Sequence, residues 1–492
     1  MSRSELPREP HATETAVPRV GVPAPRAAVD DVLTAPRPIP AADVEALRGV
    51  VRGPVLVPGD TGLDAEVAAW NVAIRHTPAI AVGATCAADV RAAVSFAVAH
   101  GLHVAVQATG HGPVRNADGS LMITTHRMRG VYVDPGRRMA RVQAGVQWRR
   151  VMEAAAEYGL AGLCGSSSGV GVIGYSLGGG MGSLGREHGF SADHVLAAEI
   201  VTADGMLRRI DAEAEPELFW AIRGGKGNFG IVTALEIELL PVPSLYAGGI
   251  FFVGADAPAV LHAFRSWAPT MPEQVSTSVA ILRLPPLDEL PPPLRGQTVV
   301  HLRFAYSGGD PAEAERLLAP MKAAGTILLG FVGPMRTDEM DGIHMDPVDP
   351  LPAREKGLLL TDLTDETVDA FLEAVGPKRE IPLIMAEIRL MGGALGRPAS
   401  VPNAVPGRSA AYAVYTVAPG VPELAHVVPA IVDGLVAGLQ PWASPEKMIN
   451  FLGEVAGPDE VAAAYPAATI ARLREVKATV DPDGVFSFGH AF

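Results

Sequence analysis

The stretch GVGVIGYSLGGGMG at residues 169–182 is half glycine, and it decides how the first half of the chain is interpreted. Two further glycine-rich stretches lie on either side of it, QATGHG at 107–112 and RGGKGNFG at 223–230. Glycine lets the backbone approach a ligand closely and leaves its N–H groups free to bind an anion. One such stretch alone would be interpreted as a tight turn. Three in one region of the chain predict a site for a large cofactor that carries phosphate.

A nicotinamide cofactor fits these stretches poorly. Two windows match G-x-G-x-x-G, at 169–174 and at 225–230. The dinucleotide-binding fingerprint needs that pattern in the turn between a strand and a helix. Neither window has this setting, and the second is followed by an obvious strand at 231–239. An NAD-dependent dehydrogenase is therefore a third alternative only, and such a protein would be colourless.

Short β-branched runs alternate with helical patterns along the first half of the chain. The runs predict strands at 79–82, 102–106, 121–124, 140–145, 195–205 and 231–239. A helix is predicted from a cap at Thr85 through His100, because apolar residues recur at helical spacing within it: Val90, Ala93, Val94, Ala97 and Val98. A second helix is predicted at 147–159, where it ends on a glycine.

The pattern changes after Pro241. Longer strands are predicted at 297–306, 382–391 and 409–418, between helices at 312–324 and 365–375, and a last helix is predicted at 472–480. Such strands predict a mainly antiparallel sheet covered by helices. The predicted fold class is α+β with two lobes, and a cleft between lobes is a usual place for a ligand.

Composition excludes several classes of function. The 492 residues carry a formal net charge of −14, and Lys and Arg are scattered, so nucleic acid is not an expected partner. Only Cys86 and Cys164 are present, which excludes a disulfide framework and a cysteine-rich metal site, and no metal is expected. No run reaches the roughly 20 apolar residues of a membrane helix. We expect a cytoplasmic protein.

The order of the motifs resembles one family of flavoproteins. QATGHG, then VGVIGYSLGGGMGSLGREHGFSADHVLAAEIVTADG (170–205) and PELFWAIRGGKGNFGIVT (216–233), are similar to the FAD-linked oxidases of the berberine-bridge-enzyme type. These belong to the vanillyl-alcohol-oxidase superfamily, which has a PCMH-type FAD-binding domain. The resemblance runs from about Val55 to Val242 and resumes at 448–451 and 472–486.

This resemblance implies a division of the chain into domains. We expect an FAD-binding domain at 41–241 and a substrate-binding domain with a helix-covered antiparallel sheet at 242–445. A C-terminal segment at 446–492 would return to the FAD-binding domain. Residues 1–40 have no apolar core and no twin arginine, so we expect a flexible leader there rather than an export signal.

The resemblance also implies how the cofactor is held. FAD would be attached by one covalent bond, between His111 and the 8α-methyl of the isoalloxazine ring. A histidine between glycines can reach a bound ring without its own backbone in the way, whereas without the flanking motifs His111 would be interpreted as a solvated loop residue. The other positions expected to bind the cofactor are Thr109, Gly110, Gly112, Ser166, Ser167, Gly169, Val170, Gly171, Val172, Gly174, Tyr175, Gly178, Gly179, Gly230, Ile231, Val232 and Asn450.

The sequence departs from the family pattern at Ser167 and Met448, and Val170 bears on the reaction with O₂. Many relatives carry a second covalent bond, from a cysteine to the flavin, and Ser167 takes the place of that cysteine here. Cys164 lies three residues earlier, and we expect it to be a small buried residue near the cofactor. Met448 stands where the family often has a tyrosine that acts as an acid or base. Val170 matches a position that resembles an oxygen gate, where a small side chain leaves room for O₂; it would serve equally well as a core valine.

Candidate catalytic groups lie on the strand predicted at 382–391. Alternation along this strand places Glu387 and Arg389 opposite its apolar set, on the face toward the cofactor. Glu387 is the first candidate for the base, with Arg389 holding it ionised or binding an acidic substrate; a structural Glu–Arg contact is the alternative. Further candidates are His344 and Asp346 in GIHMDP, and after them Tyr175, Tyr412, Tyr415, His301 and Arg303.

The resemblance implies an FAD-dependent oxidase. A small organic substrate, such as an alcohol or amine, would lose a hydride to the flavin, with O₂ as the acceptor, and natural-product metabolism is the setting by analogy. One alternative is a flavin-dependent oxygenase. The other is a redox-silent protein that binds a drug or uses FAD as a scaffold for cyclisation. The expected partners are a small-molecule substrate and O₂, with no nucleic acid and no membrane, and the chain is expected to be a monomer or homodimer.

Overall fold

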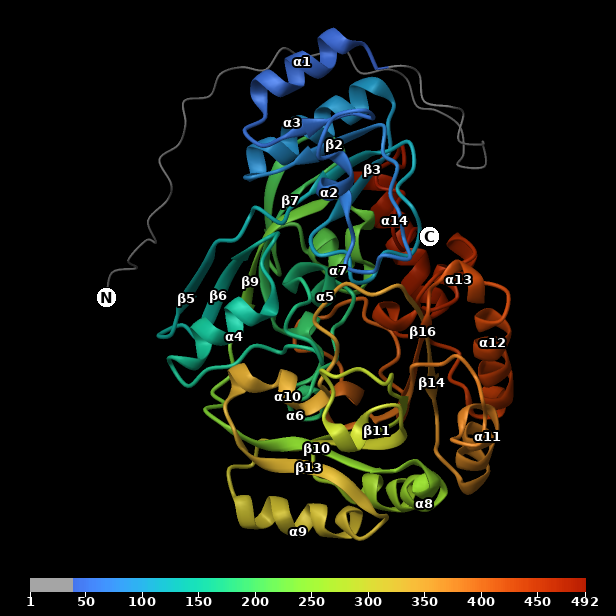
Figure 1. The fold of residues 1–492 in the computed structure, drawn as a ribbon. Helices are drawn as coiled ribbons and strands as arrows, with labels where there is room; N and C mark the ends of the chain where they lie inside the picture. The colour runs from blue at the N-terminus through green and yellow to red at the C-terminus, as the bar shows by residue number, and fades with distance from the viewer. Residues whose placement is uncertain (1–38) are drawn as a thin grey trace.

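The computed structural model describes residues 39–492, which form three β-sheets and the helices around them (Figure 1). The predicted leader at 1–40 lies almost wholly outside the described residues. Strands and helices alternate along the chain and the sheets are mixed or antiparallel, so the predicted α+β class is confirmed. Within residues 39–492, no helix combines the length and the apolar character needed to cross a lipid bilayer.

The first sheet is small and mostly parallel. Its order is β1 (Val55–Leu56), β2 (Ile80–Gly83), β4 (Leu121–Thr124) and β3 (Val104–Gln107). Helices α1 (Ala41–Val50) and α3 (Ala87–His100) cover it at the top of Figure 1. Four residues of the predicted apolar stripe of α3 are fully buried against the sheet, and this burial favours a helix here; the fifth, Val98, is exposed.

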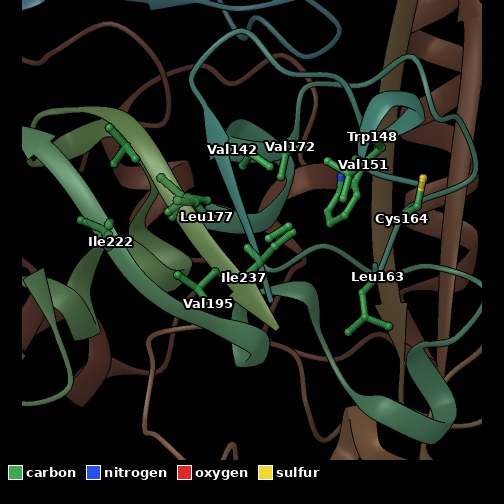
Figure 2. Packing of buried hydrophobic residues seen from close by; sticks show 14 of the residues in the cluster. Val142, Trp148, Val151, Leu163, Cys164, Val172, Leu177, Val195, Ile222 and Ile237 are labelled. Atoms are coloured by element: carbon green, nitrogen blue, oxygen red, sulfur yellow. The ribbon is translucent and has the colours of Figure 1, made fainter. Parts of the chain in front are cut away.

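The second sheet is antiparallel and shares the largest apolar core with several helices. Its order is β5 (Val131–Asp134), β6 (Met139–Gln143), β9 (Ile231–Glu238), β7 (Val195–Val201) and β8 (Leu207–Asp211). The helices packed in this core are α4 (Trp148–Ala156), α5 (Val172–Leu177), α7 (Pro216–Gly225) and α14 (Ala467–Val480). The second glycine-rich stretch contains the short helix α5, in which Val172 and Leu177 bury their side chains in this core (Figure 2).

The third sheet has seven antiparallel strands. Its order is β13 (Ile327–Met335), β10 (Leu245–Val253), β12 (Thr298–Tyr306), β11 (Val275–Arg283), β15 (Met385–Leu390), β16 (Tyr412–Pro419) and β14 (Ala353–Leu360). One face carries the apolar residues that pack against α8 (Ala257–Trp267), α9 (Pro311–Lys322), α11 (Asp365–Val375) and α12 (Val428–Leu439). These helices lie on the outer side of the molecule in Figure 1, so the other face of the sheet is turned toward the glycine-rich segments.

Short helices and one buried arginine join the sheets. The remaining helices are α2 (Leu63–Val67), α6 (Gly185–His188), α10 (Asp341–His344) and α13 (Pro458–Ala462). Arg186 of α6 is buried and donates to the carbonyl oxygens of Met391 and Pro272, both at 2.9 Å. A buried guanidinium needs such acceptors. Arg186 therefore holds the end of the second glycine-rich stretch against the third sheet.

The end of the chain returns to the first two sheets. Helix α14 packs against α7, and the N–H of Val104 in β3 donates to the carbonyl of Val485 at 2.8 Å. Asn228, in the third glycine-rich stretch, donates to the carbonyl of His490 at 2.7 Å. The C-terminal residues thus complete the region in which the glycine-rich stretches lie.

Candidate functional site

The three glycine-rich stretches lie next to one another, as the sequence predicts. A Cβ placed on Gly169 would be 3.9 Å from Nε2 of His111, and one placed on Gly171 would be 3.4 Å from Cβ of Ala108. These contacts bring the first stretch against the second. The third stretch reaches the second through Lys226, whose Cε would be 3.0 Å from a Cβ on Gly178.

Several of these glycines are required by their surroundings. Gly110 has a φ of +71°, and its Cβ would lie 2.6 Å from Cα of Ala69. Gly179 has a φ of +106°, with Val405 at 3.2 Å from its Cβ position. Such backbone conformations disfavour any other residue. Gly174 is different, because it is exposed and nothing lies within 4 Å of its Cβ position.

Gly182 leads to the first prediction, because a Cβ at this position would overlap the carbonyl oxygen of Cys164. Backbone atoms cannot move away as a flexible side chain would, so Gly182→Ala should destabilise the fold by about 3 kcal/mol or more. Thermal unfolding followed by far-UV circular dichroism measures this effect. Gly227→Ala is the matched control, because nothing lies within 4 Å of that Cβ position; equal melting temperatures for the two variants would contradict the prediction.

The first glycine-rich loop offers free backbone donors. The backbone N–H groups of residues 109–112 donate no hydrogen bond to any residue from 39 to 492. The loop is held from its carbonyl side, because Trp70 N donates to the carbonyl of Thr109 at 3.0 Å and Asn71 N to that of Gly110 at 2.9 Å. Unpaired N–H groups on a fixed loop suit the binding of an anion such as a pyrophosphate.

His111 is oriented by two neighbours. Its ring stacks on Trp70, with centroids 4.5 Å apart and planes 10° from parallel, and its Nδ1 hydrogen-bonds with Oγ1 of Thr109 at 2.9 Å. Burial lowers the pKa of His111 to about 4, because the charged imidazolium loses its hydration. At neutral pH the imidazole is therefore uncharged, which leaves a nitrogen lone pair available for bonding.

Asn450 meets the second stretch from the C-terminal segment. Its Nδ2 donates to the carbonyl of Tyr175 at 2.8 Å, and its Oδ1 fills the space that a Cβ on Gly178 would need. Met448, two residues earlier, is buried in an apolar cluster with Met181 and Leu359. The side chains of Ile231 and Val232 lie in apolar cores, while Gly230 has a φ of +152° and packs against the carbonyl of Val201.

Cys164 is a core residue and not an exposed thiol. It belongs to the apolar cluster around Trp148 and Val172, and Figure 2 shows it among these side chains. Burial raises the pKa of its thiol far above the usual range. Ser167 and Val170 are partly exposed, and the following Ser168 is fixed because its N–H donates to Oδ1 of Asp341 at 2.7 Å.

Glu387 and Arg389 lie on the predicted face of β15, and the contact predicted between them is present. Arg389 Nε donates to Oε2 of Glu387 at 2.7 Å, and Arg303 Nη1 donates to Oε1 at 2.5 Å. Ser278 Oγ also donates to Oε1, at 2.6 Å. Glu387 is fully buried, and although its burial opposes ionisation, the two guanidinium groups lower its pKa well below the usual range. A carboxylate held in this way is a weak proton acceptor.

The other catalytic candidates lie at different depths. His344 in α10 is buried, and its Nδ1 has no hydrogen-bond partner among the described residues. Asp346 lies beside Ser166, and burial raises its pKa. The hydroxyl of Tyr175 is buried without a partner in the part of the chain that the structure describes, and its ring lies edge-on to Trp148. His301 is fully buried and stacks on Phe251.

The structure does not support Tyr412 as a catalytic candidate. Tyr412 and Tyr415 are three residues apart on one strand, so they lie on opposite faces of the sheet. Tyr412 packs against the covering helices and cannot reach the cleft. Tyr415 lies on the cleft face, stacked on Phe451 with centroids 4.3 Å apart and with its hydroxyl against Glu355.

Three residues of the site carried no usable signal in the sequence. Trp70 lies beside the first glycine-rich stretch and Lys226 belongs to the third, but neither is part of a periodic pattern that would mark its side chain. Burial lowers the pKa of Lys226 to about 8. Glu355 lies on β14 in the charged segment AREK, where it would be interpreted as a solvated residue; burial raises its pKa. Within residues 39–492, no group of three His, Cys, Asp or Glu side chains is arranged to hold a metal ion.

Comparison with known proteins identifies the cofactor domain. A family model described as an FAD binding domain matches residues 78–211. The (R)-6-hydroxynicotine oxidase of Paenarthrobacter nicotinovorans is 32% identical over 234 residues, which are 47% of this chain and 48% of that protein. That alignment spans about half the length of the relative. The uncharacterized FAD-linked oxidoreductase YvdP of Bacillus subtilis is 26% identical over 89% of this chain and 97% of its own.

Solved structures match nearly the whole chain. Wild-type BBE-like 1 of Physcomitrella patens superposes with a TM-score of 0.77 at 19% identity, covering 90% of this chain and 98% of that one. Glucooligosaccharide oxidase of Acremonium strictum, described with a 6-S-cysteinyl, 8α-N1-histidyl FAD, has a TM-score of 0.78 at 20% identity, with coverage of 91% and 98%. At such identities these two structures establish the shared fold.

The fold, the converging glycine-rich loops and the matched domain together define a flavoprotein with a PCMH-type FAD-binding domain. The chain is similar over nearly its whole length to an FAD-linked oxidoreductase, and it shares the fold of a berberine-bridge-enzyme-like protein.

Proposed function

We propose that the chain is an FAD-dependent oxidase of a small organic substrate and that FAD is bound through one covalent bond to His111. The observation that carries this proposal is the neutral imidazole stacked on Trp70 in a loop whose four N–H groups have no acceptor within residues 39–492. When bound there, FAD would accept a hydride from the substrate and pass the electrons to O₂. Natural-product metabolism in the cytoplasm is the setting we propose, by analogy alone.

The residues present fit a flavin dinucleotide. The free donors at 109–112 suit the pyrophosphate, and the blocked Cβ positions at Gly110 and Gly178 leave the loops no room for larger side chains. Asn450, fixed on the carbonyl of Tyr175, is the proposed contact to the flavin ring. This assignment agrees with the proposed domains, in which 446–492 return to an FAD-binding domain at 41–241 and 242–445 bind the substrate.

A single covalent bond is proposed because the second attachment has no candidate. Glucooligosaccharide oxidase is described with both a cysteinyl and a histidyl bond, but this chain has Ser167 at the position that corresponds to the family cysteine. The Cys164 thiol is buried in the apolar core, and its raised pKa disfavours the reactive thiolate.

The proposed proton acceptor is Glu355 rather than Glu387. Glu387 is committed to two arginines, and its lowered pKa disfavours proton uptake at neutral pH. Glu355 lies on the cleft face of the same sheet against the hydroxyl of Tyr415, and burial raises its pKa toward the range in which a carboxylate accepts a proton. Glu387 would then position Arg303 and Arg389.

Acid precipitation of the purified protein tests the proposal. Yellow colour is expected to remain in the pellet, and a flavin mass is expected on the tryptic peptide that contains His111. Anaerobic mixing with a library of alcohols and amines should bleach the flavin, and air should restore the colour with release of hydrogen peroxide. A colourless protein that takes up no flavin would refute the proposal, and flavin on the Cys164 peptide would refute the single attachment.

A further inference from the structure

A row of polar side chains crosses the face of the third sheet that lies opposite the four covering helices. Strand register places Ser278 of β11 opposite both Arg303 of β12 and Arg389 of β15, and it places Glu387 opposite Tyr415 of β16. The covering helices take the apolar residues of the other face. Burial of so many polar groups in one row costs free energy unless a partner satisfies them.

A cavity of about 30 Å³ lies between this row and the second glycine-rich stretch. Six of the residues that line it are Gly182, Ser183, Ser276, Arg303, His344 and Arg389. The volume is enough for one or two water-sized groups. It therefore suits the head group of a ligand whose remainder lies outside the cavity.

Hydrogen-bond donors in the cavity lack acceptors. Arg389 uses only its Nε on Glu387, and its two Nη atoms donate to no residue from 39 to 492. Arg303 donates from Nη1 to Glu387, and its Nη2 lies 3.6 Å from Sδ of Met385, which is a weak acceptor. His344 is 8% exposed, and its Nδ1 has no partner among the described residues. Three buried side chains thus have free donor capacity around one small space.

The charges around the cavity leave a positive excess. Two guanidinium groups face the single carboxylate of Glu387. Asp346 is not among the residues that line the cavity; it lies beside Ser166, and burial raises its pKa. Burial also holds the pKa of His344 well below its usual value, so the ring is neutral. Arg186 reaches the cavity but is committed to the carbonyl oxygens of Met391 and Pro272.

We propose that this cavity binds the carboxylate of an acidic organic substrate, with the Nη atoms of Arg389 as the principal donors. A guanidinium fork matches a carboxylate in geometry and charge, and pairing with a monoanion would neutralise the positive excess. His344 and Ser276 supply further polar groups at the wall. This inference rests on the proposed function, because the acid bound here is the molecule to be oxidised.

Calorimetric titration of the flavin-loaded protein tests the inference with four probes: acetate, benzoate and the corresponding amides. Each carboxylate is expected to bind at least tenfold more tightly than its amide, because only the acid carries the charge. Arg389→Gln should weaken benzoate binding at least tenfold and leave benzamide unchanged, while Arg389→Lys should keep part of the affinity. Equal binding of acid and amide, or benzoate binding unaffected by Arg389→Gln, would overturn the inference.

A second variant covers the case in which Arg389→Gln does not fold. Ser276→Asp places a negative charge at the cavity wall without touching the ion pairs of Glu387, and it should also weaken benzoate binding at least tenfold. Arg397→Gln is the control, because Arg397 is exposed and paired with Glu273 outside the cavity. This variant should bind benzoate as tightly as the wild type does. Failure of carboxylates to bind flavin-loaded protein overturns this inference alone, whereas a protein without flavin overturns the proposed function.

Discussion

His111→Ala is expected to move all of the flavin from the acid pellet to the supernatant. The only proposed bond between chain and cofactor is at this imidazole, so its removal should leave FAD bound by non-covalent contacts alone. The free N–H groups at 109–112 belong to the backbone and survive the substitution, so the folded variant should still be yellow before acid is added. The fraction of flavin absorbance recovered in the supernatant measures the result.

A substitution at a second histidine distinguishes the loss of the covalent bond from a general loss of structure. His126→Ala removes a partly exposed imidazole, 4.0 Å from Glu66, that has no proposed contact to FAD. It should keep all of its flavin in the pellet. If His111→Ala also gives a yellow pellet, the covalent bond lies elsewhere in the chain and the proposed attachment is wrong.

Glu387→Gln is expected to cost far more stability than the removal of an exposed carboxylate. The substitution keeps the shape of the side chain but leaves Arg303 and Arg389 buried without their anion. Removing one partner of a buried ion pair typically lowers the free energy of unfolding by about 3–5 kcal/mol. Urea unfolding followed by tryptophan fluorescence should show a corresponding fall in the free energy of unfolding.

The control for this prediction is an exposed ion pair. Glu273 pairs with Arg397 at 2.7 Å, but both side chains are about half exposed, so Glu273→Gln should change stability by less than about 1 kcal/mol. If Glu387→Gln is no more destabilising than Glu273→Gln, the carboxylate of Glu387 does not stabilise the fold through Arg303 and Arg389.

The pH dependence of this contribution follows from the lowered pKa of Glu387. A group with a depressed folded-state pKa contributes fully above its unfolded value, about 4.3 for glutamate. That contribution is lost only as the pH falls through the lower folded-state pKa. The difference in stability between wild type and Glu387→Gln should therefore be constant between about pH 6 and 8 and should shrink in acid.

Local patterns predicted the parts of the fold in which one signal dominates. The stripe on α3 followed from burial of one face of that helix, although Val98 at its end is exposed. The alternation on β15 separates apolar from charged side chains, and both faces of that strand are buried. Strands β10, β13 and β14 gave no comparable signal. Two glycines interrupt β10, β13 is largely exposed at an edge, and the first half of β14 is charged. Their strand conformation comes from pairing with distant neighbours, which a local pattern does not contain.

The candidate site shows the same division. The glycine-rich loops could be predicted because positive φ values and blocked Cβ positions demand glycine wherever they occur. The partners of those loops could not. Trp70 stacks on His111 although the two lie far apart in the chain, and Glu355 meets Tyr415 only because β14 pairs with β16. Such contacts depend on tertiary structure alone.

The return of the C-terminal segment has a consequence for the order of events during synthesis. Asn450 reaches Gly178, and the carbonyl of Val485 pairs with Val104, so this region is completed by residues that are synthesised after all three glycine-rich stretches. A nascent chain that already displays all three glycine-rich loops still lacks these residues. Stable binding of FAD is therefore expected only once Asn450 and Val485 have been synthesised, and a chain cut before Asn450 is expected to bind FAD weakly although all three glycine-rich stretches are present.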